Sequence, residues 1–402
     1  MAARTGHTPL HRRRRVRAER TQALFTLVGL GLGLVMPRVS GGPQIASGQV
    51  TTMLLTLGFG VLGVVAVIFS LLFLVVQWAH SNFSPRLTLF REAPIVWRTF
   101  AMAISVTVFS ITAALAIGTR PHVSFAVPAL AGIMLLTMLA MLRRLQLQAF
   151  ASIQLAPVLL AITQRGRAIL ASLYPGPAGP VPMSDVELPA PVATVAWPGH
   201  LSVLQQIDMD ELVTAAEQCG AVIVLHVTPG EVLRHGAPLA DIRGAPLPAG
   251  AVLDCMVTGT ERTLEQDPLQ AFRLLADIVM RALSPAVNDP ATAVQGLHCL
   301  EDLLEGLQGV PRGPLYVSDH EGEPRVVLTL PDWGDFLRTG LDGIIAAAMG
   351  SPIVLMRLRA LLARLHPHVQ DRNQTAVTAR LTWVEEELAT RFPVLWNETA
   401  AG

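Results

Sequence analysis

The chain has 402 residues, of which 51% are hydrophobic and only 15% are charged. This composition favours a membrane protein over a soluble one, and the length allows two or three domains. All 30 basic residues are arginine, which excludes Schiff-base lysines, biotinyl- or lipoyl-lysines and the lysine of a phosphate-binding loop. We therefore expect no cofactor on a lysine, and no other cofactor motif is present.

The zero net charge conceals two halves of opposite sign. Residues 1–150 contain 14 arginines and two acids, whereas residues 151–402 contain 16 arginines and 28 acids. This asymmetry predicts a basic, lipid-facing half followed by an acidic, water-facing half. The three cysteines, Cys219, Cys255 and Cys299, form no C-x-x-C pair, which is typical of buried thiols in a reducing cytoplasm.

The first half begins with a basic tail and continues with four apolar stretches. The tail, residues 1–20, contains the run Arg12–Arg15. A helix needs about 20 apolar residues to cross a bilayer, and residues 21–150 predict a four-span transmembrane domain. The expected spans are residues 21–36, 51–78, 95–118 and 123–142.

The arginines predict the orientation of these spans. The tail, the loop after the second span and the exit from the fourth span are rich in arginine, whereas the two opposite loops hold only Arg38 and Arg120. By the positive-inside rule both termini are cytoplasmic, as an even number of spans requires. We expect a multi-pass protein of a bacterial inner membrane. A cleaved signal peptide over residues 1–40 is the competing interpretation, but no A-x-A site follows.

The interior of the spans is apolar and rich in small residues. The absence of Asp, Glu, Lys and His argues against ion-coupled transport. Glycines in the first two spans predict close helix packing. Hydroxyls in the third span either line a neutral pore or bond to their own or a neighbouring helix, and the sequence leaves both open. These residues are Ser105, Thr107, Ser110 and Thr112.

The second half predicts a juxtamembrane segment and a cytoplasmic α+β domain. Residues 151–191 are expected to form an amphipathic helix beneath the membrane and a proline-rich linker. Residues 192–402 group strands before helices, which favours α+β over a doubly wound sheet. The expected strands are 192–197, 200–207, 221–227 and 325–330, and the expected helices are 208–220, 269–284, 291–307, 333–348, 352–366 and 373–391.

A glycine-containing segment, residues 229–240, comes directly after the third of these strands. Gly230 and Gly236 are placed to supply positive-φ turns. The spacing is similar to the hairpin of biotinyl and lipoyl domains, but those domains carry their group on a lysine. We therefore predict a structural turn here.

Residues 261–294 are the candidate site. Asp267–Pro268 and Asp289–Pro290 each predict a helix start, and Arg273, Asp277 and Arg281 form an i, i+4, i+8 ladder. The polar side chains are expected to gather near one corner. That corner is a satisfied structural turn, an oligomer or membrane-domain contact, or a ligand or catalytic site, although no nucleophile or base stands out.

The stretches ERTLEQD and DIVMRALSPAVNDPATAV, with SNFSPRL at 81–87, resemble a bacterial family of predicted membrane proteins, domain of unknown function 2254. The resemblance covers nearly the whole chain and implies no established reaction. The motif positions that it implies are Arg262, Thr263, Gln266, Asp267, Arg281, Ser284, Asn288, Asp289, Pro290 and Thr292.

The leading hypothesis is a non-enzymatic, oligomeric membrane assembly, with a channel as one form of it, regulated or scaffolded by its cytoplasmic domain. Its expected partners are the lipid bilayer and further copies of the chain, with no nucleic acid and no metal. The alternative is a membrane-anchored enzyme or small-ligand sensor that uses the corner at 262–292. The loop that carries Ser84 and Arg86 is expected to dock on the acidic domain, with Arg86 against Asp289.

Overall fold

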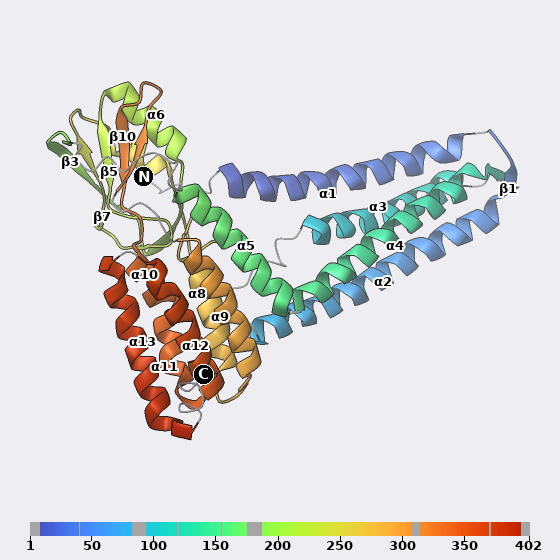
Figure 1. The fold of residues 1–402 in the computed structure, drawn as a ribbon. Helices are drawn as coiled ribbons and strands as arrows, with labels where there is room; N and C mark the ends of the chain where they lie inside the picture. The colour runs from blue at the N-terminus through green and yellow to red at the C-terminus, as the bar shows by residue number, and fades with distance from the viewer. Residues whose placement is uncertain are drawn as a thin grey trace. The chain divides into compact units, whose positions relative to one another are not determined.

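The structure of the chain is a computed structural model that describes residues 9–39, 41–82, 94–118, 120–153, 155–174, 187–307, 314–369 and 371–394 (Figure 1). The chain divides into two compact units at Leu155, the first formed by Thr8–Leu155 and the second containing Ala156–Gly402. The first is helical apart from one pair of short strands, and the second mixes helices with two larger sheets.

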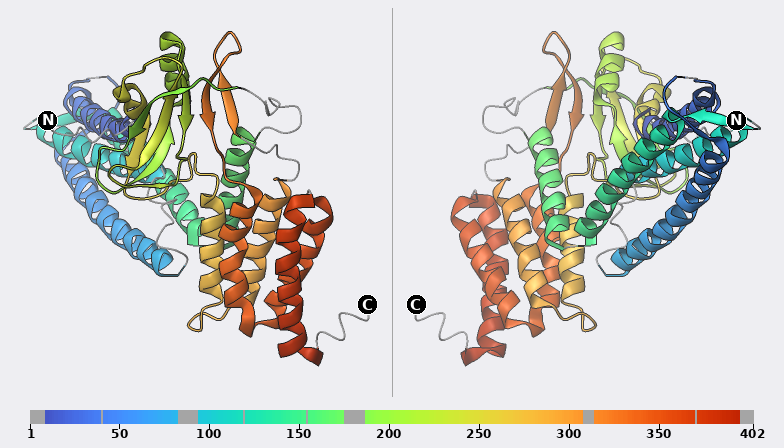
Figure 2. Two further views of the ribbon diagram at one scale, coloured as in Figure 1. Left: turned by 90° about the vertical axis from the view of Figure 1, so that its left-hand side faces the viewer. Right: turned by 90° about the vertical axis from the view of Figure 1, so that its right-hand side faces the viewer.

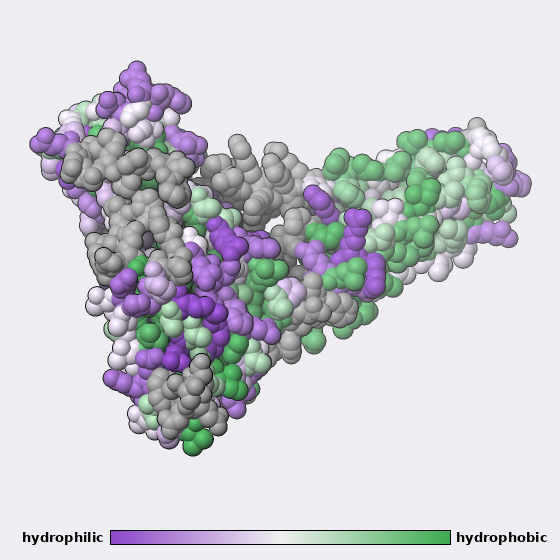
Figure 3. Space-filling view, in the orientation of Figure 1, coloured by the Kyte–Doolittle hydropathy of each residue, from purple (hydrophilic) through white to green (hydrophobic). Residues whose placement is uncertain are grey.

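Four long helices build the first unit: α1 (Pro9–Val35), α2 (Ser47–Asn82), α3 (Pro94–Ile117) and α4 (Ala126–Ile153). Each contains a stretch that is long and apolar enough to cross a membrane, with mean hydropathy between 1.2 and 2.5. Figure 3 shows that much of the visible surface of this unit is hydrophobic. The four expected spans therefore correspond to four helices.

Glycines bring α1 and α2 close to α3. A Cβ atom at Gly29 would lie 2.5 Å from the carbonyl oxygen of Ser105, and one at Gly33 would lie 2.0 Å from Oγ1 of Thr112. A Cβ atom at Gly58 would lie 3.1 Å from that of Ser110. Small residues permit such approach in apolar helices. Three of the hydroxyl residues considered for a pore thus face glycines of neighbouring helices, which does not support a pore lined by them within one chain.

The connections α1–α2 and α3–α4 bond to each other at one end of this unit. Strand β1 (Gln44–Ala46) pairs antiparallel with β2 (His122–Ser124). Arg120 donates from Nη1 to the carbonyl oxygen of Pro37, in η1 (Met36–Arg38), at 2.6 Å. The two connections that carry few arginines therefore lie together, as they must if successive helices cross a membrane in opposite directions.

Two sheets form the β part of the second unit. The five-stranded sheet has the order β3-β7-β5-β10-β9, with β5 and β10 parallel and its other pairs antiparallel, and the three-stranded antiparallel sheet has the order β6-β4-β8. The strands are β3 (Pro191–Ala196), β4 (Ser202–Ile207), β5 (Val222–Leu225), β6 (Val232–Leu233), β7 (Pro238–Arg243), β8 (Met256–Gly259), β9 (Leu315–Ser318) and β10 (Pro324–Leu328).

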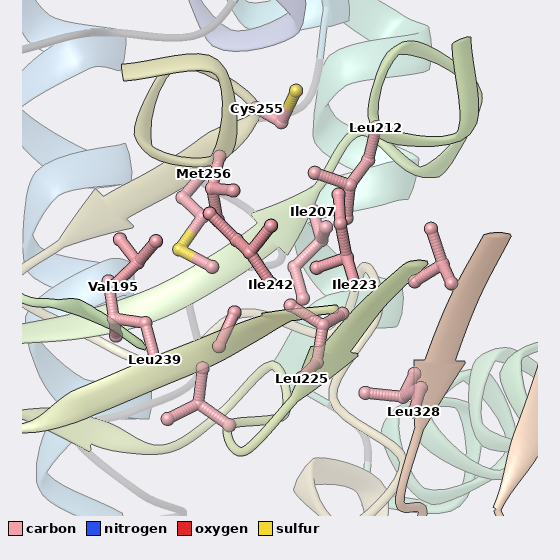
Figure 4. Packing of buried hydrophobic residues seen from close by; sticks show 14 of the residues in the cluster. Val195, Ile207, Leu212, Ile223, Leu225, Leu239, Ile242, Cys255, Met256 and Leu328 are labelled. Carbon is pink, nitrogen blue, oxygen red and sulfur yellow. The ribbon is translucent and has the colours of Figure 1, made fainter. Parts of the chain in front are cut away.

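The core of the β part lies between these sheets and α6 (Met209–Cys219), near the short α7 (Ala249–Asp254). Ile223 and Leu225, two residues apart in β5, point to the same side, as the period of a strand requires. Figure 4 shows both with Ile242 of β7 in this core. Gly220 ends α6 with a φ of +66°, as the sequence predicts. The segment predicted as a turn, residues 229–240, contains β6 and the first half of β7, because short strands with few apolar residues give no clear alternation.

The remaining helices of the second unit pack beside one another. Contacts join α8 to α9, α9 to α12 and α12 to α13, and Figure 2 shows these four helices side by side. The elements are α5 (Leu155–Leu173), α8 (Gln270–Ala282), α9 (Pro290–Glu305), α10 (Trp333–Leu337), the π-helical η2 (Arg338–Asp342), α11 (Gly343–Ala347), η3 (Ala348–Gly350), α12 (Pro352–Leu365), η4 (His366–His368) and α13 (Asp371–Arg391).

Helix α5 is the predicted amphipathic helix, and its position beneath the membrane stays a prediction. Its apolar face is covered by protein, because a Cβ atom at Gly166 would lie 2.7 Å from Cβ of Ala271 in α8 and 3.2 Å from Cδ2 of Leu303 in α9. Arg167 pairs with Asp302 of α9. The amphipathic pattern is real, but it packs α5 onto the helices of the second unit.

Candidate functional site

Most of the candidate residues at 262–292 lie at the two ends of α8, and not at one corner. Asp267 precedes the helix and Ser284 follows it. Thirteen helical residues rise by about 20 Å at 1.5 Å per residue. The structure therefore divides the set into an upstream group, Arg262–Asp267, and a downstream group, Ser284–Thr292.

The upstream group bonds to backbone atoms that are far away in the sequence. Gln266 accepts the amide hydrogen of Ile207 at 2.8 Å and donates to the carbonyl oxygen of the same residue at 3.2 Å. Arg262 donates from Nε to the carbonyl oxygen of Gly230 at 2.7 Å. The group thereby ties the start of the helical part to the end of β4 and to the turn before β6.

Asp267 is the buried centre of the upstream group, with 2% of its surface exposed. Its carboxylate accepts the amide hydrogen of Leu269 at 2.9 Å and pairs with Nη1 of Arg273 at 2.7 Å. Burial raises the pKa of Asp267, and the charges of Arg273 and Arg262 oppose that rise. Helix α8 begins only at Gln270, so Asp267 precedes the helix and is not its N-cap residue.

Gly230 makes room for this carboxylate. Its φ is +98°, and a Cβ atom there would lie 2.1 Å from Oδ2 of Asp267. Gly236 also has a positive φ, +78°, but a Cβ atom there would meet nothing within 4 Å. Both glycine turns agree with the sequence prediction, and only the first belongs to the candidate site. Thr263 is partly exposed, although its Oγ1 atom is buried without a hydrogen-bond partner among the described residues.

The downstream group forms the turn between α8 and α9. Asp289 is the N-cap residue of α9, with Pro290 in the first turn, and it accepts the amide hydrogen of Thr292 at 3.1 Å. The hydroxyl and amide of Thr292 lower the pKa of Asp289. Ser284 donates to the carbonyl oxygen of Arg281 at 2.7 Å. The predicted helix start at Asp289 is confirmed.

The tight turn requires one unusual backbone conformation. Asn288 has a φ of +46°, the one positive value among the described residues that are not glycine, and asparagine adopts that region more readily than most side chains. Its amide donates to the carbonyl oxygen of Ser284 at 2.9 Å, and that of Asp289 donates to Ala282 at 2.8 Å. The downstream bonds are thus all local.

The structure describes two of the four remaining candidate residues. Asp277 and Arg281 lie half-buried on α8, and both take part in interactions. Ser84 and Arg86 lie outside the described residues. Docking of their loop on the acidic domain therefore stays a prediction.

The carboxylates of Asp267 and Asp289 both accept hydrogen bonds from nearby groups. Asp267 is held by a backbone amide and an arginine, and Asp289 is held by the first turn of α9. Within the described part of the chain, no group of three or more His, Cys, Asp or Glu residues is arranged to hold a metal ion. Each carboxylate is thus held by neighbouring donors, as buried and capping acids usually are.

A second ionic cluster was not found from the sequence. Glu301 of α9, 7% exposed, pairs with Arg357 and Arg364 of α12. The one available signal was an acid on the otherwise apolar face of a predicted helix. Its partners lie 56 and 63 residues away, so spacing alone could not identify them.

Comparison with known proteins gives a family and relatives without an assigned activity. The profile of a family described as "Predicted membrane protein (DUF2254)" matches residues 20–364. Uncharacterized proteins of Mycobacterium bovis and Mycobacterium tuberculosis are 28% identical over 379 residues, covering 86% of this chain and 70% of each relative. No solved structure matches the chain significantly.

Proposed function

The chain belongs to the DUF2254 family of predicted membrane proteins, and from that premise we propose that it is an oligomeric, non-enzymatic protein of a bacterial inner membrane. Its four long helices span the bilayer, and its second unit is a cytoplasmic domain with a scaffolding or regulatory role. One observation supports the non-enzymatic role. Arg262 and Gln266 bond to Gly230 and Ile207 in the β part, and Asp267 bonds to Arg273 in α8, so the three residues connect the β part of the second unit to α8.

The side chains of the first unit support the membrane part of the proposal. Large apolar residues are exposed on its helices, including Phe73 at 72%, Leu115 at 75% and Leu136 at 67%. Water is a poor environment for such a surface, and each side chain of this kind gains about 1.5–3 kcal/mol when it leaves water. Lipid supplies that environment.

The arginine distribution supports a cytoplasmic location for both termini. The connections that join at β1 and β2 carry few arginines, whereas the opposite ends carry many. A green fluorescent protein fused after residue 402 is expected to fluoresce, and alkaline phosphatase fused after residue 41 is expected to be active. The reverse pattern would overturn the orientation.

The packing of α3 also bears on the form of the assembly. Ser105, Ser110 and Thr112 contact glycines of α1 and α2, so a channel that uses them would require these helices to separate. We therefore propose an assembly that does not depend on a pore along α3. Outward-facing apolar surfaces of α2 and α4 remain available for lipid or for further copies.

The alternative, an enzyme or ligand sensor at 262–292, gains less support. A single site would have to join groups separated by the length of α8, about 20 Å. Each group is already bonded to nearby backbone. A thermal-shift screen against metals, nucleotides and lipids tests this alternative, since a ligand lost on Asp289→Ala but not on Asp254→Ala would revive it.

Native mass spectrometry of the full-length protein in detergent tests the oligomeric assembly. We expect a single predominant oligomer that persists on dilution. A spectrum with monomer alone, under conditions in which the protein stays folded, would contradict the proposal. Cross-linking in intact membranes provides an independent check that detergent has not dissociated the copies.

A further inference from the structure

The ionic cluster between α9 and α12 has more donors than its acid can satisfy. Glu301 accepts from Nε and Nη2 of Arg364 at 2.7 and 2.9 Å, one bond on each carboxylate oxygen. Arg357 adds a bond from Nη2 to one of these oxygens. Two guanidinium groups thus share one carboxylate.

The unsatisfied donors belong to the buried arginine. The side chain of Arg357 is 9% exposed, and its Nε and Nη1 atoms are buried without a hydrogen-bond partner among the described residues. A buried donor without a partner destabilises the folded state, and more so when it is charged. The next acid on α9, Asp302, pairs with Arg167 of α5 and does not relieve this cluster.

His298 lies within the electrostatic influence of the same three charged residues. Burial lowers the pKa of His298 most, Arg357 and Arg364 lower it further, and Glu301 opposes them. His298 precedes Glu301 by three residues, so the two share a face of α9. Its side chain is exposed, as is that of Arg364 at 59%, which leaves the cluster accessible from solvent.

We propose that this cluster binds an oxyanion, a phosphate group that is either free or part of a lipid headgroup. The anion binds at the exposed guanidinium of Arg364 and the exposed ring of His298, and the buried charge of Arg357 adds to its attraction. Arginine suits this role because its planar group binds phosphate with two parallel hydrogen bonds. The exposed Ile353, four residues before Arg357 and 56% exposed, offers an apolar contact beside the charge. The site does not depend on the proposed function.

The test uses the full-length protein in neutral detergent and inorganic phosphate at constant ionic strength. We expect the thermal-unfolding midpoint to rise with phosphate until the site is saturated. Arg357→Met is expected to weaken phosphate binding at least tenfold. The matched control is Arg359→Met on the same helix, because Arg359 pairs with Glu385 instead, and it should bind phosphate like the unmodified protein.

Two further arms identify the source of the phosphate group and guard against misfolding. Short-chain phosphatidic acid, with phosphatidylcholine of equal chain length as control, replaces inorganic phosphate to test for a lipid headgroup. Arg364→Met, at an exposed position, should weaken binding even if Arg357→Met does not fold. The proposal is overturned if neither phosphate nor phosphatidic acid shifts the midpoint, or if the shift persists in the folded arginine variants.

Discussion

The two ends of α8 carry similar polar residues but differ in the distance over which they act. Upstream, Gln266 and Arg262 bond to Ile207 and Gly230, which belong to a different part of the second unit. Downstream, Asp289 and Ser284 bond within a few residues of themselves. Polar groups that join distant segments stabilise the whole unit, whereas local caps stabilise one helix. Substitutions at the two ends of α8 test this difference.

Gly230→Ala is expected to have the largest effect. A Cβ atom at this position would collide with the carboxylate of Asp267, and φ there is +98°. We expect the free energy of unfolding to fall by more than about 3 kcal/mol, measured by denaturant titration of the full-length protein. Gly236→Ala is the control, because Gly236 also has a positive φ but no atom lies within 4 Å of the added Cβ. For this variant we expect the free energy of unfolding to fall by about 1–2 kcal/mol. Equal losses would show that Asp267 does not need the space.

Asp267→Ala is expected to rank second. It would leave Arg273 and Arg262 without their buried carboxylate. Breaking a buried pair from one side costs about 3 kcal/mol. The measurement is the same denaturant titration. If the free energy of unfolding fell by less than about 1 kcal/mol, the usual cost of losing a helix cap, the two ends of α8 would not differ in the way proposed.

Asp289→Ala is expected to cost about 1 kcal/mol, the usual value for an N-cap residue. The loss arises because the amide of Thr292 no longer has the carboxylate as its acceptor. Hydrogen exchange should increase in the first turn of α9 and leave β4 unchanged. A change that extends to β4 would mean that the downstream turn also supports the sheets.

The pH dependence of these losses is expected to differ in sign. Asp267 has a raised pKa in the folded state. Its protonation therefore stabilises the folded state, fully at pH values below the ordinary pKa of 3.8. This stabilisation is lost as pH rises through the pKa of the folded state. Asp289 has a lowered pKa, so its contribution is present above 3.8 and lost as pH falls through the folded value. The cost of Asp267→Asn should therefore grow between pH 7 and pH 4, whereas that of Asp289→Asn should not. Parallel profiles would contradict this assignment.

Local signals allowed much of the fold to be predicted from the sequence. Apolar runs identified the four long helices, Gly220 identified the end of α6, and Asp289–Pro290 identified the start of α9. These features depend on residues close in the chain, for which spacing is informative. Four strands of the second unit were missed. Strands β6, β8 and β9 have only two to four residues, which give no readable alternation, and β7 begins within the segment that was predicted as a turn.

The candidate site could be predicted only as a set of residues, and its geometry could not. Gln266 and Ile207 are 59 residues apart, and nothing in either local sequence selects the other. The face of α5 illustrates a second limit, since an apolar stripe is buried equally well by lipid or by protein. Here the small Gly166, against Ala271 of α8, shows that protein covers it.

The joint between the sheets and α8 is tested most directly by hydrogen exchange at the amide of Ile207, whose acceptor is the side chain of Gln266. In the full-length protein with Gln266→Ala, we predict faster exchange at Ile207 and in the turn at 228–231, with α9 unaffected. The control Thr292→Ala should leave the amide of Ile207 as protected as in the unmodified protein. Unchanged protection of Ile207 in Gln266→Ala would contradict the structural role assigned to the upstream group.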